Sequence, residues 1–386
     1  MIKITNKEDC CGCSACASVC THNAIKLRAD EEGFLYPSVD INNCIDCGLC
    51  EKVCPILQRK GKMCKDTTEK FFFAVRHKNP EILINSSSGG AFSALAEYVL
   101  ENKGVVYGAV YNKKMQVVHA RAINKNEYAL MRGSKYSQSD IYGIYSKCKG
   151  DLKKGVLVLF TGTPCQIAGL KSYLMRSYEN LITVDLVCHA VPSPKVFADY
   201  VQSINKRFHD KLISINMRYK KSHGWSHSFS YCYTFRSGKE IVDPVGVNNW
   251  GRIFFSGFID RPSCHECKFT NFNRAGDITI ADFWDDLFLR PDIKSKNGTS
   301  LFIVNSENGK NLLEKLTDKM YFWEVTKYES LQRCLIKPSD ASPKRNEFWN
   351  YYLKNGFEKT CKRYFFISKK TIIVQSIKIF IKKIFK

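Results

Sequence analysis

The sequence has no apolar segment that approaches the roughly 20 residues needed to cross a membrane. Residues 1–9 are polar, so the chain shows no apolar signal peptide and a secreted protein is not expected. Acidic residues are fewer than basic ones. The chain has 37 Asp and Glu and 59 Lys and Arg, which gives a formal net charge of +22. A hydrophobic content of 44% excludes disorder as the main description. The 386 residues allow about two or three domains.

Cysteine, by contrast, is abundant, and nine of the 18 cysteines lie before residue 55. Two runs repeat the spacing C-x2-C-x2-C-x3-C, namely Cys10, Cys13, Cys16 and Cys20, and Cys44, Cys47, Cys50 and Cys54. In two-cluster ferredoxins the first three cysteines of such a run hold one 4Fe–4S cluster and the fourth ligates the other. The spacing therefore predicts one cluster on Cys10, Cys13, Cys16 and Cys54 and a second on Cys44, Cys47, Cys50 and Cys20.

Zinc and disulfide bonds are the alternatives for these two runs. Zinc sites use pairs of cysteines rather than runs of four, and disulfides fit poorly with a chain that shows no signal peptide. Thr21 stands where the usual pattern has Pro, and Cys11 is interpreted as a spare thiol. Residues 1–57 thus resemble the bacterial two-cluster ferredoxin domain, which predicts an α+β ferredoxin-like fold for this segment.

Residues 58–70 are polar and charged, and they are interpreted as a linker to a domain over residues 71–325. In that domain the hydrophobic pattern predicts strands over 71–76, 104–111, 117–121, 156–160, 181–187, 229–235, 278–283 and 301–305. It also predicts helices over 91–102, 165–174, 194–207 and 307–318. Strands that alternate with helices favour an α/β domain with a mostly parallel or mixed sheet. Residues 326–386 are expected to form a helical, basic C-terminal region.

Two loops of the α/β region have residues suited to chemistry. Ser86, Ser87, Ser88, Gly89 and Gly90 lead into a helix whose free N–H groups suit a phosphate, although an ordinary helix cap is an equal interpretation. Thr161, Gly162, Thr163 and Pro164 follow a strand and place Cys165 in a first helical turn, where the helix dipole favours a thiolate. Such a thiolate could be a nucleophile, a redox thiol or a metal ligand.

A second set of cysteines occupies loop-like positions. Cys165 and Cys188 each follow a strand, and Cys264 and Cys267 form a C-x2-C pair. The four could converge on a third 4Fe–4S cluster, form a zinc site or remain inert thiols, and their spacing does not distinguish these options. The other cysteines fit no pattern and are interpreted as structural, namely Cys64, Cys148, Cys232, Cys334 and Cys361.

Six motifs follow one another along the chain: SSSGGAF at 86–92, GSKY at 133–136, TGTPCQIAGL at 161–170, Cys188-His189, the pair Cys264 and Cys267, and DITIADFW at 277–284. Over residues 1–310 the chain resembles the beta-subunit family of coenzyme F420 hydrogenases and dehydrogenases, to which the flavoprotein 7-hydroxymethyl chlorophyll a reductase belongs. The resemblance implies an FAD-binding domain and a third cluster beside the flavin, ligated by Cys165, Cys188, Cys264 and Cys267. Ala190 and Ala281 stand where many relatives have glycine.

A flavin suits this chemistry, because clusters pass single electrons whereas most organic reductions need two. The chain has no G-x-G-x-x-G fingerprint, so other groups would hold the FAD pyrophosphate. The candidates are Ser86, Ser87, Ser88, Gly89, Gly90, Lys135, Thr161, Gly162, Thr163 and Pro164, with Arg274 and Lys171 as further cations. The sequence identifies no proton donor, and the catalytic candidates are His223, His227 and Asp282. His189 and His265 are expected to tune a cluster or to pack.

The C-terminal residues 362–386 carry eight Lys and Arg and no acid. Ile373, Ile377, Phe380, Ile381 and Ile384 share one helical face, which predicts a basic amphipathic helix that lies on an anionic membrane or docks on the protein. A basic surface would also attract an acidic electron donor such as ferredoxin or flavodoxin. No nucleic-acid module is recognisable, so nucleic-acid binding is not expected.

We therefore expect a cytoplasmic iron–sulfur flavin-dependent oxidoreductase whose tail could touch the inner face of the membrane. Electrons would enter at the N-terminal clusters, pass through the third cluster to FAD and reduce a small organic substrate, or flow in reverse. Coenzyme F420 and an intermediate of polysaccharide synthesis are the candidate substrates. One alternative is a non-catalytic electron-transfer subunit of a larger redox complex. Another is a membrane-associated assembly protein in polysaccharide synthesis with structural clusters.

Overall fold

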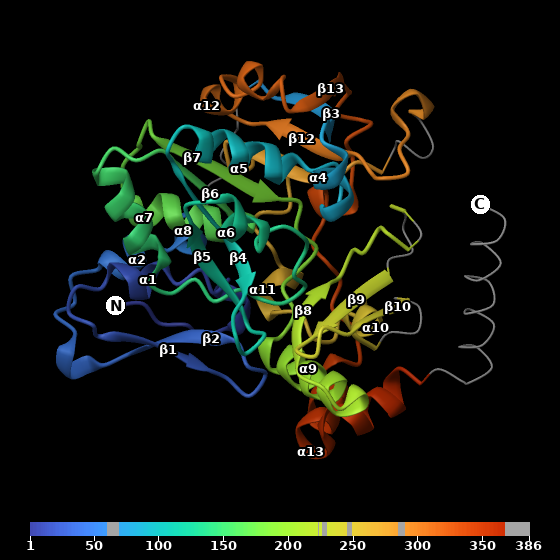
Figure 1. Cartoon of the computed structure of the whole chain (residues 1–386). Coiled ribbons are helices and arrows are strands. Elements are labelled where there is room, and N and C mark those ends of the chain that lie inside the picture. The colour runs from blue at the N-terminus through green and yellow to red at the C-terminus, as the bar shows by residue number, and fades with distance from the viewer. Residues whose placement is uncertain (60–68, 223, 226–229, 245–248, 285–289, 367–386) are drawn as a thin grey trace.

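The structure, a computed structural model, describes residues 1–59, 69–222, 224–225, 230–244, 249–284 and 290–366 (Figure 1). Residues 60–68 of the expected linker and residues 367–386 of the expected amphipathic tail lie outside this description. Within it, no helix is both long enough and apolar enough to span a membrane.

The first 59 residues surround a two-stranded antiparallel hairpin, β1 (Ile25–Ala29) and β2 (Leu35–Val39). Short helical elements connect the cysteines, namely η1 (Lys7–Asp9), α1 (Ala15–Val19), η2 (Ile41–Asn43), α2 (Leu49–Lys52) and α3 (Pro55–Arg59). Ala15 and Val19 of α1 belong to the same hydrophobic core as helices of the next domain. Figure 1 accordingly shows this segment, in blue, lying against the large domain.

The large domain contains an eight-stranded mixed sheet. Its strands are β3 (Phe71–His77), β4 (Val105–Tyr111), β5 (Val117–Ala122), β6 (Val158–Gly162), β7 (Leu181–Leu186), β11 (Ile278–Asp282), β12 (Ser300–Val304) and β13 (Met320–Glu324). They lie in the order β13-β3-β12-β11-β7-β6-β4-β5, with β11, β7, β6 and β4 parallel in the centre. The outer pairings are antiparallel. The predicted α/β domain with a mixed sheet is confirmed.

Helices cover both faces of this sheet, because alternate strand residues point to opposite sides. Tyr107 and Phe160 share one core with α7 (Ile144–Lys153) and α8 (Pro164–Leu174). Their neighbours Val106 and Leu159 pack on the other face, against α5 (Ala91–Glu101) and α6 (Lys125–Ala129). The N-terminal segment shares the core of α7 and α8, and this fixes it beside the end of β6.

A smaller sheet is antiparallel, with the order β10-β9-β8. Its strands are β8 (Leu212–Asn216), β9 (Ser230–Phe235) and β10 (Glu240–Pro244). It packs around Trp250 with α9 (Pro194–Phe208), α10 (Asn249–Phe254) and α13 (Arg345–Tyr364). Figure 1 shows these elements together, in yellow-green to red. The remaining short helices are α4 (Pro80–Asn85), α11 (Pro262–His265) and α12 (Glu307–Lys310).

The predicted strands and helices match observed elements to within two residues at each end, with one exception. The helix expected over 307–318 is wrong, because α12 ends at Lys310 and a 3-10 turn follows at η6 (Glu314–Leu316). Gly309 lowers the helix propensity of this segment and packs closely, since an added Cβ would stand 2.5 Å from the Asp277 carbonyl oxygen. The pattern gave no bounds for the N-terminal hairpin, β8, β10, β13 or α7, whereas α13 lies inside the C-terminal region that was expected to be helical.

Candidate functional site

Both N-terminal cysteine runs follow the same backbone path. Gly12 and Ser14 of the first run have φ of 70° and 62°, and Asp46 and Gly48 hold the same two positions in the second run with φ of 51° and 71°. Positive φ is uncommon for residues other than glycine, so its recurrence at matching positions marks a shared loop shape. Each loop then enters a short helix, α1 or α2.

The eight cysteines of these runs border two cavities of similar size. One cavity of about 400 Å³, counting its open mouth, is lined by Cys10, Cys13, Cys16 and Cys54. The other, of about 390 Å³, is lined by Cys20, Cys44, Cys47 and Cys50. The structure thus brings together the interleaved sets that the spacing predicts, with the fourth cysteine of each run at the other run's cavity.

The possible metal ligands at both cavities are cysteine thiols, and their burial favours the protonated form. Burial raises the pKa of the Cys16 thiol to about 12 and also raises the pKa of Cys54. Iron would displace these protons, because a metal binds the thiolate form. Within the described residues, no three Cys, His, Asp or Glu side chains surround a point closely enough for a single metal ion.

A third cavity, of about 590 Å³ with its mouth, lies between the N-terminal segment and the large domain. It is lined by Cys165 from the first turn of α8, Cys188 after β7, Cys264 of α11 and Cys267. The structure therefore brings the second cysteine set together at the carboxyl ends of parallel strands, where open α/β sheets usually hold ligands.

Sequence reasoning missed two further cysteines of this cavity. Cys334, interpreted as structural, lines it, and its Sγ lies 3.8 Å from Nδ1 of His189. Cys11, interpreted as spare, lines both the third cavity and the Cys10 cavity, as does Ile56. These two cavities therefore share a wall. By contrast, Cys148, Cys232 and Cys361 are buried in hydrophobic cores, whereas Cys64 lies outside the described residues.

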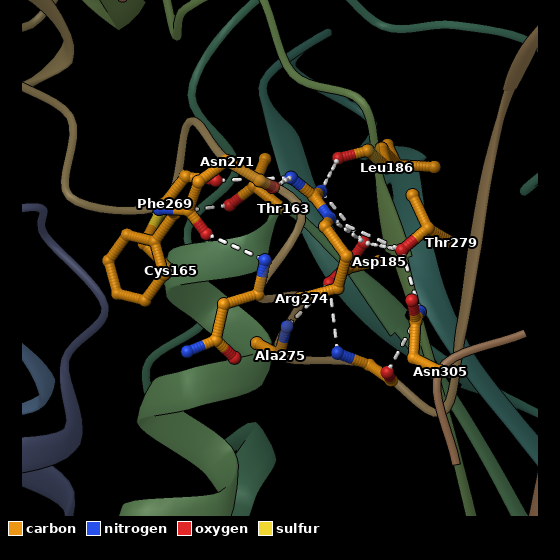
Figure 2. A network of polar contacts seen from close by, with 12 residues as sticks. Thr163, Cys165, Asp185, Leu186, Phe269, Asn271, Arg274, Ala275, Thr279 and Asn305 are labelled. Carbon is orange, nitrogen blue, oxygen red and sulfur yellow. Dashed lines mark hydrogen bonds and ion pairs between the residues drawn. The ribbon is translucent and has the colours of Figure 1, made fainter. Parts of the chain in front are cut away.

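Arg274, a candidate for the pyrophosphate, is held instead by a buried polar network (Figure 2). Its guanidinium donates to Asp185 at 2.8 Å. It also donates to three carbonyl oxygens, those of Phe269, Asn271 and Leu186. The other carboxylate oxygen of Asp185 accepts the N–H groups of Ala275 and Gly276. The network fixes the segment after Cys267 onto β7, so this arginine positions a cavity wall and is not available to a phosphate.

The loop over 86–90 lies beside the turn that precedes Lys135. Ser87 Oγ accepts the backbone N–H of Ser134 at 2.8 Å, which joins the 86–90 loop to the turn before Lys135. Gly89 is packed so tightly that an added Cβ would stand 2.3 Å from the Val75 carbonyl oxygen. The hydroxyls of Ser86 and Ser88 already donate to carbonyl oxygens. Gly90 has φ of 85° and is the N-cap of α5. The N–H of Gly89 already donates to Ser300 Oγ at 2.8 Å, so the hydroxyls of Ser86 and Ser88 and this N–H are all engaged within the protein.

Two lysines near these loops donate to carbonyl oxygens. The ammonium of Lys135 donates to the carbonyls of Met131, Arg132 and Gly133. The ammonium of Lys220 donates to those of Leu83, Ser88 and Asn297. Burial lowers the pKa of each lysine to about 7. In the described part of the chain neither has a carboxylate partner. Lys220 was missed, because one lysine in a lysine-rich chain carries no signal.

The loop over 161–164 borders the third cavity through Pro164 and Cys165. Its hydroxyls are engaged, since Thr161 Oγ1 donates to the Tyr107 carbonyl oxygen at 3.0 Å and Thr163 Oγ1 lies 3.1 Å from Cys165 Sγ. Gly162 ends β6 between them. This loop therefore positions Cys165, and it lies at the cysteine cavity rather than at the 86–90 loop. Lys171 lies 3.6 Å from Asp277.

Of the catalytic candidates, Asp282 forms a buried ion pair with Arg218 at 2.9 Å, and Trp225 Nε1 donates to it at 3.4 Å. His223 and His227 lie outside the described residues. His189 lines the third cavity, and Nδ1 of His265 donates to the Ser339 carbonyl oxygen at 3.0 Å. Burial lowers the pKa of both histidines.

Known families match three stretches of the chain. Residues 9–56 match the 4Fe-4S dicluster domain. Two further stretches match the coenzyme F420 hydrogenase/dehydrogenase beta-subunit family, residues 72–144 its N-terminal part and residues 156–329 its C-terminal part. The iron–sulfur character predicted for the N-terminal segment is confirmed by the first match.

Two curated proteins are similar to this chain. The F component of F(420)H(2) dehydrogenase from Methanosarcina mazei is 21% identical over 315 residues, which cover 76% of this chain and 82% of that protein. Coenzyme F420-dependent sulfite reductase of Methanocaldococcus jannaschii is 25% identical over 359 residues, which cover 91% of this chain and 53% of that protein. The chain therefore spans about half the length of the second relative. A solved structure, of the F420-reducing [NiFe] hydrogenase complex from Methanosarcina barkeri, shares 19% identity with a TM-score of 0.46 and covers 77% of this chain and 92% of that one.

Proposed function

Because the chain belongs to the coenzyme F420 hydrogenase/dehydrogenase beta-subunit family, we propose that it is an iron–sulfur flavoprotein that passes electrons between 4Fe–4S clusters and FAD. The observation that carries this proposal is the presence of three cavities, each bordered by at least four cysteines. Cys10, Cys13, Cys16 and Cys54 would hold one cluster, and Cys20, Cys44, Cys47 and Cys50 the second. Cys165, Cys188, Cys264 and Cys267 would hold the third.

The order of the cavities suggests the direction of transfer. Cys47 and Ile45 are exposed, so the cavity of Cys20 and Cys47 is the one that an external electron donor can approach. The Cys10 cavity comes next, since Cys16, Cys20, Cys50 and Cys54 pack in one cluster of side chains. An electron would then pass from the Cys10 cavity to the third cavity through the wall that the two share. A protein such as ferredoxin or flavodoxin, or another member of a redox complex, would deliver electrons at the outer cavity.

The flavin would lie near the carboxyl ends of the parallel strands. FAD, when bound, converts single-electron transfer into the two-electron exchange that organic substrates need. Its diphosphate is dianionic. Burial lowers the pKa of Lys135 and Lys220 to about 7, and a bound dianion would hold both side chains in the charged form. The backbone around Ser87 and Gly90 and the positive end of α5 would complete this site.

The substrate would be a small organic molecule, and coenzyme F420 is the first candidate because both curated relatives carry F420 in their names. An intermediate of polysaccharide synthesis is the second. A non-catalytic role is also proposed, since one relative is named as a dehydrogenase subunit. In that case reduced ferredoxin would bleach the flavin, but no substrate would reoxidise it unless a partner protein were added.

The experiment that tests the proposal is anaerobic purification with iron, sulfide and flavin measured on the same sample. Three clusters and one flavin predict about twelve irons, twelve sulfides and one FAD per chain. About eight irons without flavin would limit the protein to its ferredoxin segment. A colourless protein, or one that holds zinc, would refute the proposal.

A further inference from the structure

Arg261 connects the N-terminal segment to the large domain at the wall of the Cys10 cavity. The residue is 0% exposed, and it directly precedes α11, the helix that carries Cys264. Its Nε donates to the Cys10 carbonyl oxygen at 2.6 Å, and its Nη2 donates to the Leu35 carbonyl oxygen at 2.9 Å. One side chain of the α/β domain therefore holds both the first cysteine loop and the hairpin.

The same guanidinium also faces a sulfur atom. Nη2 lies 3.5 Å from Cys10 Sγ, and Nη1 donates to Oε1 of Gln138 at 3.0 Å. The ring of Tyr36 lies 4.3 Å from the guanidinium carbon. Throughout the described ranges, no carboxylate forms an ion pair with Arg261. A full positive charge is thus buried beside a cysteine with only neutral groups and sulfur around it.

The position of this charge is fixed by close packing. An added Cβ at Gly12 would stand 2.7 Å from Nη1 of Arg261 and 2.6 Å from Nε2 of Gln138. The loop between Cys10 and Cys13 therefore lies directly on the guanidinium. A side chain placed so closely cannot turn away toward water without moving the loop.

The second run has a different hydrogen-bond donor, and it contacts the third cysteine of that run rather than the first. Cys50 Sγ accepts the neutral backbone N–H of Ile2 at 3.2 Å. The nearby ammonium of Met1 is exposed, and Asp46 neutralises it at 2.9 Å. Two loops with the same backbone shape thus sit in different electrostatic surroundings.

We propose that Arg261 is a positioning residue that raises the reduction potential of the cluster at Cys10, Cys13, Cys16 and Cys54 above that of its twin. This inference rests on the proposed function. Each transfer moves one electron, which leaves the twin cluster and reduces this one, and no bond or proton is exchanged. Reduction makes the cluster more negative, so a buried cation and an N–H group aimed at a ligand sulfur stabilise the reduced form. Electrons would then run downhill from the exposed cavity to the inner one.

The test is anaerobic redox titration of the holoprotein, followed by electron paramagnetic resonance. Arg261→Gln removes the charge and keeps an N–H donor, and we expect the potential of one cluster to fall while the others stay unchanged. Arg261→Lys keeps the charge, so its shift should be smaller. Cys47→Ser marks the signal of the twin cluster and shows that the shifted signal is the other one.

A second variant covers the case in which Arg261→Gln does not load its clusters. Gln138→Glu places a carboxylate at the atom that already contacts Nη1, and it should lower the same potential by pairing the cation. Arg345→Gln is the matched control, because Arg345 also joins the two parts of the chain but pairs with Glu32. It should leave all potentials unchanged.

Two results would overturn the inference. One is a loaded Arg261→Gln or Gln138→Glu variant with every potential unchanged. The other is an Arg345→Gln variant that lowers the same potential as much, because the effect would then follow from loosened docking. A wild-type protein without iron would overturn the proposed function itself, and the iron assay separates that failure from these two.

Discussion

Replacement of Arg274 by methionine should destabilise the protein strongly. The side chains of Arg274 and Asp185 are 1% and 0% exposed, so methionine would leave a buried carboxylate without its cation. Removal of one partner from a buried ion pair typically costs about 3–5 kcal/mol. Asp185 would keep only neutral donors, namely the hydroxyl of Thr279 and the N–H groups of Ala275 and Gly276.

The expected change in melting temperature follows from the size of the chain. At about 2.1 cal/mol/K per residue, cooperative unfolding of 386 residues has an entropy of about 0.8 kcal/mol/K. A loss of about 3–5 kcal/mol therefore lowers Tm by about 4–6 °C. Anaerobic calorimetry at one scan rate measures this shift, with iron contents matched because cofactor loss breaks two-state unfolding. Arg290→Met removes a more exposed ion pair and should lower Tm by only about 1 °C.

The double variant Arg274→Met with Asp185→Asn tests the cause of the shift. It removes both charges, so it should lose less stability than the sum of the two single variants. The reasoning is refuted if Arg274→Met melts within about 1 °C of the wild type. It is also refuted if the two single effects simply add, because an ion pair requires coupling between them.

Three further predictions concern the cysteines and two buried titratable groups. The Cys264→Ser variant should lose about four of the twelve irons. Cys361 is buried and borders none of the three cavities, so Cys361→Ser should lose none in the same iron assay. Burial lowers the pKa of His119 to about 4, so the unfolded chain binds more protons below pH 6.5 and stability falls by up to about 3 kcal/mol as the pH drops. His119→Gln should flatten this slope in urea titrations at pH 7 and 5, while the exposed His209→Asn should keep it. Burial raises the pKa of Asp260 to about 7, so the folded chain holds the extra proton and stability falls as the pH rises from about 4 to 7. Asp260→Asn should therefore be more stable than the wild type at pH 8 and equal to it at pH 4, and an equal Tm at pH 8 would contradict the assignment.

The parts of the site that the sequence predicts are those in which local spacing reflects local geometry. The ferredoxin-type runs are predictable, because the short loops between Cys10 and Cys16 and between Cys44 and Cys50 can only serve neighbouring corners of one cluster. The central strands are predictable for a similar reason, since parallel strands buried on both faces are continuous apolar runs such as 156–160. Both signals lie within about ten residues of chain.

The parts that the sequence does not predict depend on distant partners. Arg274 and Asp185 are 89 residues apart, and Arg261 and Cys10 are 251 apart, so neither local composition nor periodicity indicates their contact. Cys334 reaches the third cavity from a 3-10 turn with no cysteine motif around it. The small sheet was missed in part for a local reason. A bulge between Leu212 and Ser214 breaks the alternation of buried and exposed residues in β8.

The buried cations of this chain fall into two groups. Arg274 and Arg218 each have a carboxylate partner, Asp185 or Asp282, and these pairs hold the ends of β7 and β11 in place. Arg261, Lys135 and Lys220 have no carboxylate partner in the described ranges. Burial of an uncompensated charge is unfavourable, so an anionic group bound beside these three side chains would stabilise their charged forms. A 4Fe–4S cluster with four thiolates and a flavin diphosphate are both anionic, and the positions of the three cations are those at which the two groups are proposed to bind. The net charge of +22 is therefore not only a property of the surface, because part of it is placed where bound cofactors would balance it.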